Sequence, residues 1–277
     1  MTDIIEYFDN AMIQHGKEND RVYLMKLGNS NADNVINFIE KLAAENQYTK
    51  IFTKVSVLDK KEFINRGYRE EAFIPKFFKG QEDCYFLVKY PDENRSKLTD
   101  KDDIESVIST SLKKKTENNK LYLSLDFVFE ELGVNKTSEI AKLYNEVFET
   151  YPFPIFDPHY ILKTMQENII YFGIKKDDKL VALSSAEIDY ENLNAEMTDF
   201  ATHRDYRGNN LSLFLLQKME DKIRALGIKT AYTIARSLSY GMNITFARNN
   251  YEFGGTLANN TNIYGKIESM NVWYKNI

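Results

Sequence analysis

The sequence predicts an α/β (α+β) fold built from two similar halves, and three observations predict it. Apolar residues alternate at strand spacing in some segments and recur at helical spacing in others, along the whole chain. Residues 194–226 have the pattern of a strand, a short polar loop and a long helix. Segment 40–55 aligns with segment 220–235 at a constant offset of 180, which indicates a weak internal repeat.

Composition excludes several classes of protein. The 277 residues are 43% hydrophobic and 28% charged, as in ordinary globular domains. A balance of 36 Lys+Arg against 41 Asp+Glu argues against a nucleic-acid binder, because such binding depends on neutralising phosphates. A single cysteine, Cys84, and three scattered histidines argue against an internal disulfide and a metal site. Without a signal peptide or long apolar run, we expect a cytoplasmic protein that does not enter a membrane.

The first half begins with a strand and alternates helices with strands. Apolar residues follow the candidate N-cap Asp33 at helical spacing, and Gly67 is placed to end a short helix. Pro75 indicates a strand at the edge of a sheet. The predicted elements are a strand at 22–27, a helix at 34–47, a strand at 48–55, a helix at 59–68 and strands at 73–78 and 84–90.

Residues 91–120 are charged and contain few core residues, apart from a helical segment at 104–112. We therefore predict a charged connector at 96–120 between an N-terminal domain at 1–95 and a second domain at 121–277. The run of lysines at 113–115 is typical of a solvated helix face rather than of a binding patch.

The second half repeats the alternation of helices and strands. Thr137 or Ser138 is placed to cap a helix, and Asp177-Asp178 forms the turn of a hairpin. The predicted elements are a strand within 121–132, helices at 137–151 and 159–167, a hairpin over 169–190, a strand at 194–202, a helix ending at Gly227, a strand at 228–235, a helix at 241–250 and a last strand at 270–275.

The loop at 203–210, with sequence HRDYRGNN, lies between a strand and a helix. The first N–H groups of a helix have no partner inside it, and the helix dipole adds positive potential there. Arg204 and Arg207 flank the same point. The loop is therefore a predicted anion site, most simply for a pyrophosphate.

The order of elements in the second half and the segment Arg207–Ser212 resemble the GNAT acyltransferase family. The family's loop has the form Q/R-x-x-G-x-G/A, and here Asn210 replaces the middle glycine while Ser212 replaces the last small residue. Asn tolerates the left-handed conformation and Ser is small, so we expect the loop to work. The first half has LGNSNADN at this place, so we interpret it as a degenerate GNAT half-repeat without chemistry.

A wider set of segments resembles the β-lysine N-acetyltransferases, a branch of GNAT. These segments are IQHGKENDRVYLMKL, YPFPIFD, NAEMTDFAT, TAYTIARSLSYGMNITFA, GGTLANNTNI and IESMNVWYK. The resemblance implies transfer of acetyl from acetyl-CoA to the ε-amine of β-lysine, giving the compatible solute Nε-acetyl-β-lysine. His203-Arg204 is a local departure, since an apolar residue and a proline are expected there.

The resemblance also implies which residues bind acetyl-CoA. The strand before the loop splays from its neighbour in GNAT enzymes and holds the pantetheine and thioester with its backbone. The residues that match this role, the pyrophosphate loop and a helix residue beside the coenzyme are Phe200, Ala201, Thr202, Arg207, Gly208, Asn209, Asn210, Leu211 and Asn243.

Glu196 is the predicted general base, because several GNAT enzymes carry a glutamate at about this place. The competing interpretation is an exposed or lysine-paired acid. Strand alternation places Glu196 on one face with Thr198, Phe200 and Thr202, and Asp199 on the other. Phe246 occupies the position where many GNAT enzymes have an acidic tyrosine. Tyr240 is the nearest substitute; a packing role for it, a water molecule as acid and the absence of any acid stay open.

Substrate recognition requires one cation for the carboxylate and acids for the amines. Arg236 is the predicted ligand of the carboxylate, and Glu187, Asp189 and Glu268 are candidates for the 3-amine. Asn259, Asn260 and Asn262 form a polar cluster that we expect to line the pocket.

Two other functions stay open: a GNAT enzyme acting on another small amine (polyamine, lysine or aminoglycoside), and a non-catalytic acyl-CoA-binding module. We expect acetyl-CoA as co-substrate, no metal, a small amine as partner, no nucleic acid and no membrane, and we allow for a homodimer. The first half is expected to pack on the second and to cover the substrate site.

Overall fold

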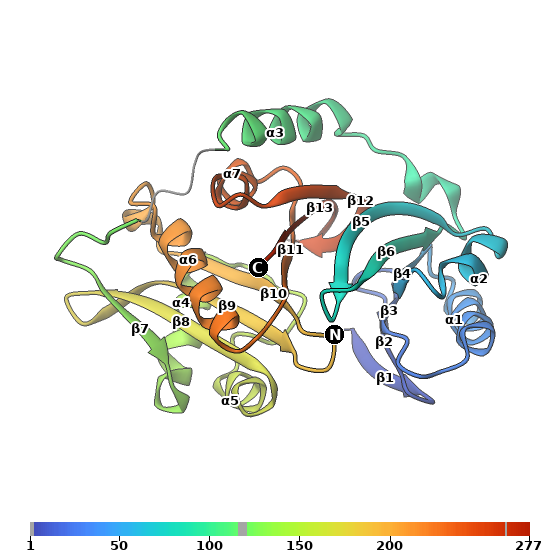
Figure 1. Cartoon of the computed structure of the whole chain (residues 1–277), viewed down its shortest axis with the longest axis horizontal. Helices are drawn as coiled ribbons and strands as arrows, with labels where there is room; N and C mark the ends of the chain where they lie inside the picture. The colour runs from blue at the N-terminus through green and yellow to red at the C-terminus, as the bar shows by residue number, and fades with distance from the viewer. Residues whose placement is uncertain (1–2, 116–120, 264) are drawn as a thin grey trace.

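All strands belong to one mixed sheet. The computed structural model describes residues 3–115, 121–263 and 265–277, and its thirteen strands lie in the order β1-β2-β3-β4-β6-β5-β12-β13-β11-β10-β9-β8-β7 (Figure 1). Three predictions fall partly outside these ranges: residues 1–2 of the first domain, residues 116–120 of the connector and residue 264 of the second domain.

The strands span Ile4–Phe8 (β1), Ala11–Gly16 (β2), Arg21–Lys26 (β3), Lys50–Ser56 (β4), Arg69–Phe78 (β5), Glu82–Lys89 (β6), Val128–Leu132 (β7), Ile169–Lys176 (β8), Lys179–Asp189 (β9), Asn194–Thr202 (β10), Thr230–Arg236 (β11), Glu252–Ile263 (β12) and Lys266–Asn276 (β13). The α-helices span Ala32–Asn46 (α1), Lys60–Asn65 (α2), Lys101–Lys113 (α3), Thr137–Val147 (α4), Pro158–Glu167 (α5), Leu211–Ala225 (α6) and Tyr240–Arg248 (α7). Short 3-10 turns lie at Glu93–Ser96 (η1), Val134–Lys136 (η2) and Arg204–Tyr206 (η3).

The N-terminal half, residues 3–90, and the C-terminal half, residues 121–277, repeat one topology. In each, a strand leads through a helix to a parallel neighbour, β3 to β4 and β10 to β11. A short helix and an antiparallel strand pair then follow, β5–β6 and β12–β13. The offset read from the sequence holds, since β4 begins at Lys50 and β11 at Thr230. One sheet runs through both halves, so the division into domains stays a prediction.

The halves join where β5 meets β12. Their register consists of Ala72 opposite Gly255, whose φ is +144°. A Cβ on Gly255 would lie 2.2 Å from the Glu71 carbonyl oxygen, so glycine is required for this approach. Pro75 does not lie at the edge of the whole sheet, as predicted, because β5 is an inner strand. The pairing with β12 is confined to Ala72, so the missing N–H of Pro75 breaks no bond of that ladder.

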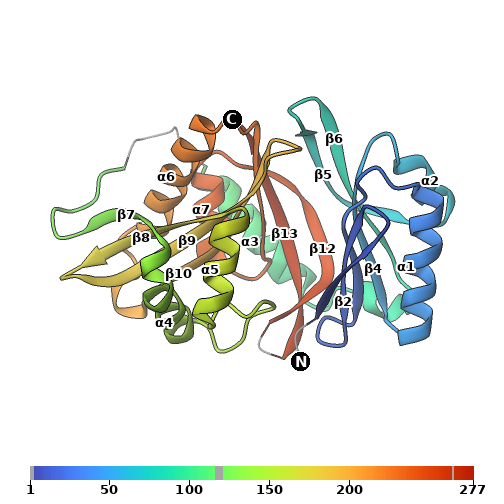
Figure 2. The same cartoon turned by 90° about the horizontal axis from the view of Figure 1, so that it is seen from below.

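An apolar cluster fills the space between the halves. Tyr23, Phe52 and Phe77 of the N-terminal half belong to the same buried cluster as Tyr232 and Val272 of the C-terminal half. The face of the N-terminal sheet that packs there is the one opposite α1 and α2 (Figure 2). The N-terminal half therefore lies against β11 and β13, beside the strands expected to carry the chemistry.

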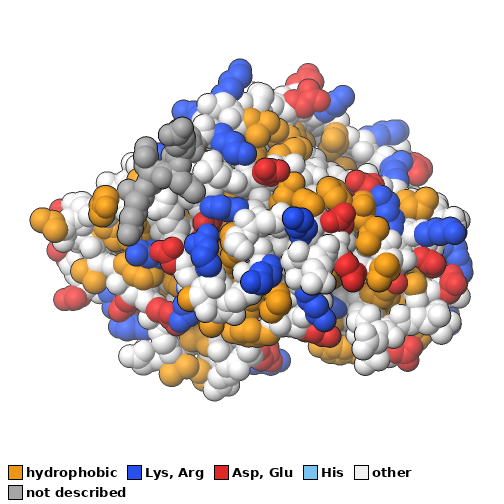
Figure 3. Space-filling model, in the orientation of Figure 1, with side chains coloured by type: hydrophobic (Ala, Val, Ile, Leu, Met, Phe, Trp, Pro, Cys, Tyr) orange, Lys and Arg blue, Asp and Glu red, His pale blue; other side chains and the backbone are white. Residues whose placement is uncertain are grey.

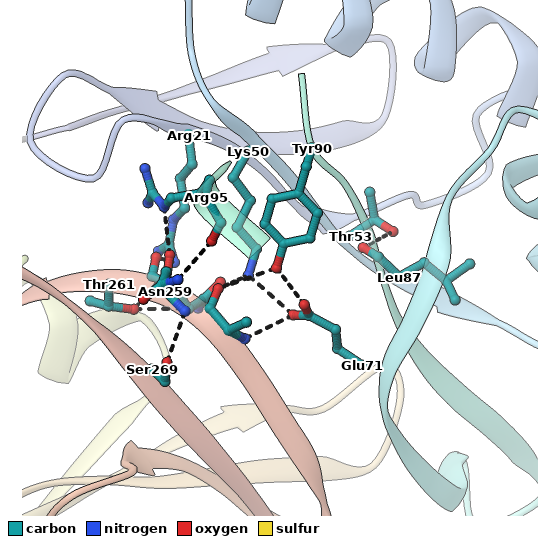
Figure 4. Close-up of polar contacts among 12 residues, drawn as sticks. Arg21, Lys50, Thr53, Glu71, Leu87, Tyr90, Arg95, Asn259, Thr261 and Ser269 are labelled. Carbon is teal, nitrogen blue, oxygen red and sulfur yellow. Dashed lines mark hydrogen bonds and ion pairs between the residues drawn. The ribbon is translucent and has the colours of Figure 1, made fainter. Parts of the chain in front are cut away.

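A buried polar network reinforces this junction (Figure 4). The Lys50 side chain is fully buried, and its Nζ donates to the Ala258 carbonyl at 2.7 Å and to Glu71 Oε2 at 3.1 Å. The Tyr90 hydroxyl also donates to Glu71. Burial lowers the pKa of Lys50 to about 8, although Glu71 acts in the opposite direction. Since an unpaired buried charge is costly, this pair fixes β12 against the N-terminal half.

The asparagines expected to line the pocket belong to this junction. Arg95 Nε donates to the Asn259 carbonyl at 2.8 Å, and Asn259 Nδ2 donates back to the Arg95 carbonyl at 2.7 Å. The Asn262 backbone N–H donates to Asn19 Oδ1 at 2.8 Å, and Arg21 Nη1 donates to Thr261 Oγ1 at 3.2 Å. These hydrogen bonds join Asn259 and Asn262 to the N-terminal half, and their place in the pocket stays a prediction.

The connector contains the predicted helix, α3, which is longer than the pattern indicated. Its buried side chains Ile104 and Val107 are on the face that packs on α7 (Figure 1). The expected strand within 121–132 is shorter in the structure, because only β7 at Val128–Leu132 pairs with β8. The connector thus covers one helix of the C-terminal half.

Candidate active site

The parallel strands β10 and β11 part in the middle of the C-terminal half. Their pairing consists of Asn194 with Thr230, Ala195 with Ala231 and Glu196 with Tyr232. Beyond Glu196, β10 runs on to Thr202 without a register partner on β11. Backbone N–H and C=O groups on that side of β10 are therefore left for other partners. This is the splay that the resemblance implied.

A β-bulge in β10 changes which side chains share a face. The register with β9 shifts between Thr198 and Ala201, and Asp199 has φ +54°. Asp199 Oδ2 accepts from Ser185 Oγ at 2.5 Å, although Ser185 lies directly opposite Thr198. Asp199 thus lies on the same face as Glu196, so the strict alternation predicted from the sequence was wrong.

The bulge also moves Phe200 to the opposite face. Phe200 packs edge-to-face on Phe246, with ring centroids 5.6 Å apart, beneath α7. Thr202 Oγ1 lies 3.2 Å from Ser212 Oγ of α6. Glu196 instead faces the side of α4 and α5, as does Ala201. The segment after the bulge therefore separates two faces of the sheet. Helices α6 and α7 pack on one face, and Glu196 and Asp199 lie on the other.

Glu196 is the centre of the acidic side. Burial, the cross-strand neighbour Glu187 and Asp199 raise its pKa, while Lys54 and a hydrogen bond from Tyr232 lower it, and the net pKa is about 7. Burial likewise raises the pKa of Glu187. Protein atoms surround Glu187, but part of its side chain remains accessible to solvent. Within the described ranges, its carboxylate forms no ion pair or hydrogen bond. A carboxyl group with a pKa near 7 suits proton transfer at neutral pH.

The loop before α6 has the open, uncapped geometry expected of the predicted anion site. Gly208 has φ +84° and Asn210 has φ +54°, and a Cβ on Gly208 would meet no atom within 4 Å. Asn210 thus adopts the left-handed conformation expected of the family's glycine. No side chain caps α6, and Phe214 N–H is the first to bond back, to the Asn210 carbonyl at 3.0 Å. The N–H groups of the first helical turn therefore face outward.

Arg248 is a cation at this site that the sequence did not reveal. It ends α7, and its Nη1 donates to Asn210 Oδ1 at 2.9 Å. Arg207 is exposed, and its Nε reaches the Thr202 carbonyl at 3.4 Å. Lys, Arg, Asp and Glu side chains are all present on the face of the molecule shown in Figure 3.

Comparisons with known proteins agree with this geometry. The profile described as "Acetyltransferase (GNAT) family" matches residues 138–239. A β-lysine N(6)-acetyltransferase of Methanococcus maripaludis is 42% identical over 277 residues, which cover 99% of each chain. The chain belongs to the GNAT acetyltransferase family. It is therefore an N-acetyltransferase with the GNAT fold, as predicted.

Two further relatives support the same family. A β-lysine N(6)-acetyltransferase of Methanosarcina mazei is 30% identical over 255 residues, covering 85% of this chain and 94% of that one. The N-acetyltransferase YodP of Bacillus subtilis is 29% identical over 271 residues, covering 96% of each. These relatives span both halves, so the acetyltransferase shares its N-terminal half with them.

The side chains of Tyr240 and Asn243 both form hydrogen bonds within the protein. Tyr240 is 45% exposed at the start of α7, and its hydroxyl lies 3.0 Å from Ser106 Oγ of α3. Asn243 is fully buried, and its Nδ2 donates to the carbonyls of Arg236 and Ser239. Its Oδ1 accepts from Asn271 Nδ2 and Trp273 Nε1. With both donors and both lone pairs used, the Asn243 side chain holds α7 in place, and a role for Asn243 in coenzyme binding stays a prediction.

The predicted substrate ligands other than Glu187 are already paired. Asp189 accepts from Asn192 Nδ2 at 2.9 Å and forms an ion pair with Lys26 Nζ at 3.0 Å. Burial opposes the charge of Asp189, but these partners lower its pKa overall. Arg236 donates two hydrogen bonds of 2.8 Å to Glu268. Because Arg236 and Glu268 engage each other, their independent roles toward the substrate are not supported.

Two further groups at the acidic face were missed from sequence. Tyr151, between α4 and α5, donates its hydroxyl to Asp199. Lys54 of β4 crosses from the N-terminal half, and its Nζ donates to the Tyr232 hydroxyl at 3.1 Å. The signal for Lys54 was weak, since a lysine in a strand is ordinarily exposed. Only the packing of the halves brings it here.

Other kinds of site are not evident in the described part of the chain. Within residues 3–115, 121–263 and 265–277, no group of three His, Cys, Asp or Glu side chains could hold a metal ion. Over the same ranges, each helix is too short or too polar to cross a bilayer.

Proposed function

We propose that this acetyltransferase transfers the acetyl group of acetyl-CoA to the ε-amine of β-lysine. The observation that carries the proposal is Glu196, a carboxyl with a pKa near 7 at the point where β10 and β11 part, beside an uncapped helix N-terminus. Two relatives, 42% and 30% identical, bear the name β-lysine N(6)-acetyltransferase. The fold and the substrate thus rest on different evidence.

The residues around α6 fit the phosphates of acetyl-CoA. The open space at Gly208 admits a ligand close to the backbone, and the outward N–H groups from Asn209 to Leu213 supply donors. Arg207 and Arg248 add positive charge, with Arg248 at hydrogen-bond distance of Asn210. When bound, the coenzyme supplies the acetyl thioester. Phe200, Ala201 and Thr202 have no register partner on β11, and their backbone groups are placed to hold its pantetheine arm.

Glu196 acts as general base in this proposal. The substrate amine is an ammonium ion with an ordinary pKa near 10.4, and it must lose a proton before it can attack. Glu196 accepts that proton at its carboxylate, and Glu187 attracts the incoming cation. The Tyr232 hydroxyl, bonded to both Lys54 and Glu196, orients the carboxylate. A base with a pKa near the working pH is efficient in such a transfer.

A backbone N–H of β10 after the bulge is the proposed donor to the developing oxyanion. The segment after the bulge keeps its pairing with β9 but has no register partner on β11, so its N–H groups on that side have no competing strand. The described surroundings of Tyr240 do not favour it as the acid for the leaving sulfur. Since thiolates leave readily, the proposal requires no dedicated acid.

The second candidate is transfer to another small amine. The observation that favours it is the general character of the acidic face, where Glu187, Glu196 and Asp199 suit many diamines. A panel of β-lysine, lysine, a polyamine and an aminoglycoside, with release of free thiol as the readout, ranks these substrates. A homodimer, action in the cytoplasm and the osmolyte role of the product stay predictions.

The proposal is tested by incubating the purified chain with acetyl-CoA and β-lysine and locating the acetyl group by tandem mass spectrometry. The expected product carries acetyl on the ε-amine, and the expected kcat/KM for β-lysine exceeds that for lysine. Acetylation of the 3-amine would overturn the regiochemistry. Binding of acetyl-CoA without turnover of any amine would support the non-catalytic alternative.

A further inference from the structure

Lys54 projects from the N-terminal half toward the acids of the C-terminal half. It lies on β4, and its Nζ is 3.1 Å from the Tyr232 hydroxyl. The ammonium also lies over two aromatic rings, 5.3 Å from the centroid of Tyr232 and 5.7 Å from that of Phe77. The hydrogen bond and the two cation–π contacts together hold the ammonium group in place.

The cation has no carboxylate partner of its own. Across residues 3–115, 121–263 and 265–277, no Asp or Glu forms an ion pair with Lys54, although Glu196 and Glu187 are near enough to act on it electrostatically. Charges in protein interiors are ordinarily paired, since desolvation is costly. Two other lysines at the junction, Lys26 and Lys50, each have a carboxylate within 3.1 Å. Lys54 is therefore an exception that points to a ligand.

We propose that Lys54 binds the carboxylate of the amino-acid substrate, so that the N-terminal half completes the acceptor site. This inference rests on the proposed function, because it requires an acceptor that carries both amines and a carboxylate. The substrate would lie with its ammonium groups toward Glu187 and Glu196 and its carboxylate toward Lys54. A zwitterion matches this separation of charge, whereas a diamine leaves Lys54 without a partner.

The residue predicted for this task from sequence is less suitable. Arg236 donates two hydrogen bonds of 2.8 Å to Glu268, so a substrate carboxylate would compete with an existing bidentate pair. Lys54 has donors left beyond the bond to Tyr232, since an ammonium group carries three hydrogens. In the repeat, Ile234 of β11 corresponds to Lys54 at the offset of 180. The charge is thus peculiar to the N-terminal copy.

The test compares two acceptors that differ only in the carboxylate. These are β-lysine and 1,4-diaminopentane, in which hydrogen replaces the carboxyl group. Lys54→Met should raise KM for β-lysine about 10- to 100-fold and leave KM for 1,4-diaminopentane within about threefold of the wild type, as loss of a charge-assisted bond predicts. Lys54→Arg should recover most of the affinity. Lys89→Met, which removes a lysine paired with Glu40 on the opposite face of the same half, is the matched control and should change neither KM.

The outcomes separate the two proposals. If the wild type does not acetylate β-lysine, the proposed function fails and this inference fails with it. If wild-type turnover is normal but Lys54→Met raises both KM values equally, or shifts only the acid limb of the pH profile, Lys54 tunes Glu196 and the carboxylate assignment is wrong. Calorimetry on each variant identifies a folding defect. If Lys54→Met has such a defect, Lys54→Arg decides the question. Unchanged selectivity of Lys54→Arg between the two acceptors supports the assignment, and lost selectivity overturns it.

Discussion

The two helices that follow the parallel strands, α1 and α6, begin in opposite ways. In the N-terminal half, Asn31 caps α1, and its side chain accepts from the Asn34 N–H at 3.0 Å. Gly28 is packed so closely that a Cβ would lie 2.6 Å from the Asn10 carbonyl oxygen. In the C-terminal half, no side chain caps α6 and the space at Gly208 is open. One topology therefore gives a capped, closed helix start in one copy and an uncapped, open one, the proposed anion site, in the other.

The strands before these helices, β3 and β10, differ in how far they run beyond their last pair with the parallel neighbour. The last pair between β3 and β4 joins Leu24 to Thr53, and β3 ends two residues later, at Lys26. The last pair between β10 and β11 is at Glu196, and β10 continues for six residues to Thr202. Tyr23 of β3 stands where β10 has Glu196. The two halves thus differ in the two features on which the proposed chemistry depends, the unpaired strand segment and the acid beside it.

The largest expected effect comes from removing that acid. Glu196→Gln should lower kcat about 10²- to 10⁴-fold, the range of general-base catalysis, with the Kd for acetyl-CoA unchanged. In the wild type, activity should rise with pH across about 7, because the base works only when deprotonated. The variant should lack that limb. Steady-state kinetics from pH 5.5 to 8.5 measure both quantities.

The matched control is Glu70→Gln, which removes an acid of β5 paired with Lys60 in the N-terminal half. Its kcat and pH profile should equal those of the wild type. Undiminished turnover of Glu196→Gln would show that the substrate amine loses its proton to water or to another carboxylate, and Glu187 would then be the next candidate.

A smaller effect is expected from one alanine at each of the two glycines. Gly208→Ala places a methyl group in the open anion site and strains a left-handed residue, so it should weaken acetyl-CoA binding about tenfold and destabilise the fold by about 1 kcal/mol. Gly28→Ala should do the reverse: a crowded Cβ and positive φ lower Tm by several degrees, while the Kd for acetyl-CoA is retained. Calorimetric titration and thermal melts check the pair. Weakened coenzyme binding in Gly28→Ala alone would reverse the assignment of the two helix starts.

The smallest effect concerns the caps. Asn31→Ala should lower the free energy of unfolding by about 1 kcal/mol, because α1 loses the acceptor for its first turn. Asn210→Gly should cost less, since Asn210 caps no helix, glycine adopts positive φ freely, and only the exposed hydrogen bond from Arg248 is lost. Urea unfolding of both variants measures the difference. Equal losses would mean that Asn210 contributes to the helix start in solution.

The sequence by itself determined the features that depend on residues near one another in the chain. The strand–loop–helix at 194–226, the left-handed Asn210 and the offset of 180 between the halves were all predicted and are present. Local periodicity and turn chemistry decide these features, because they involve contacts over a few residues. Glu196 could be singled out as a candidate in the same way, since it lies on the strand leading into the loop.

The tertiary structure decided which charges are available. Arg236 engages Glu268, Asn243 uses every bond it can form, and Asp199 turns onto the face of Glu196. Lys54 reaches the site only because β5 joins β12 and brings the N-terminal half against β11. The ion pair that a charged group forms, the number of hydrogen bonds that a side chain has left for a ligand, and the pKa of a buried acid all depend on neighbours that are distant in the chain and close in space. No pattern within one segment contains that information, because the bulge and the packing of the two halves create it.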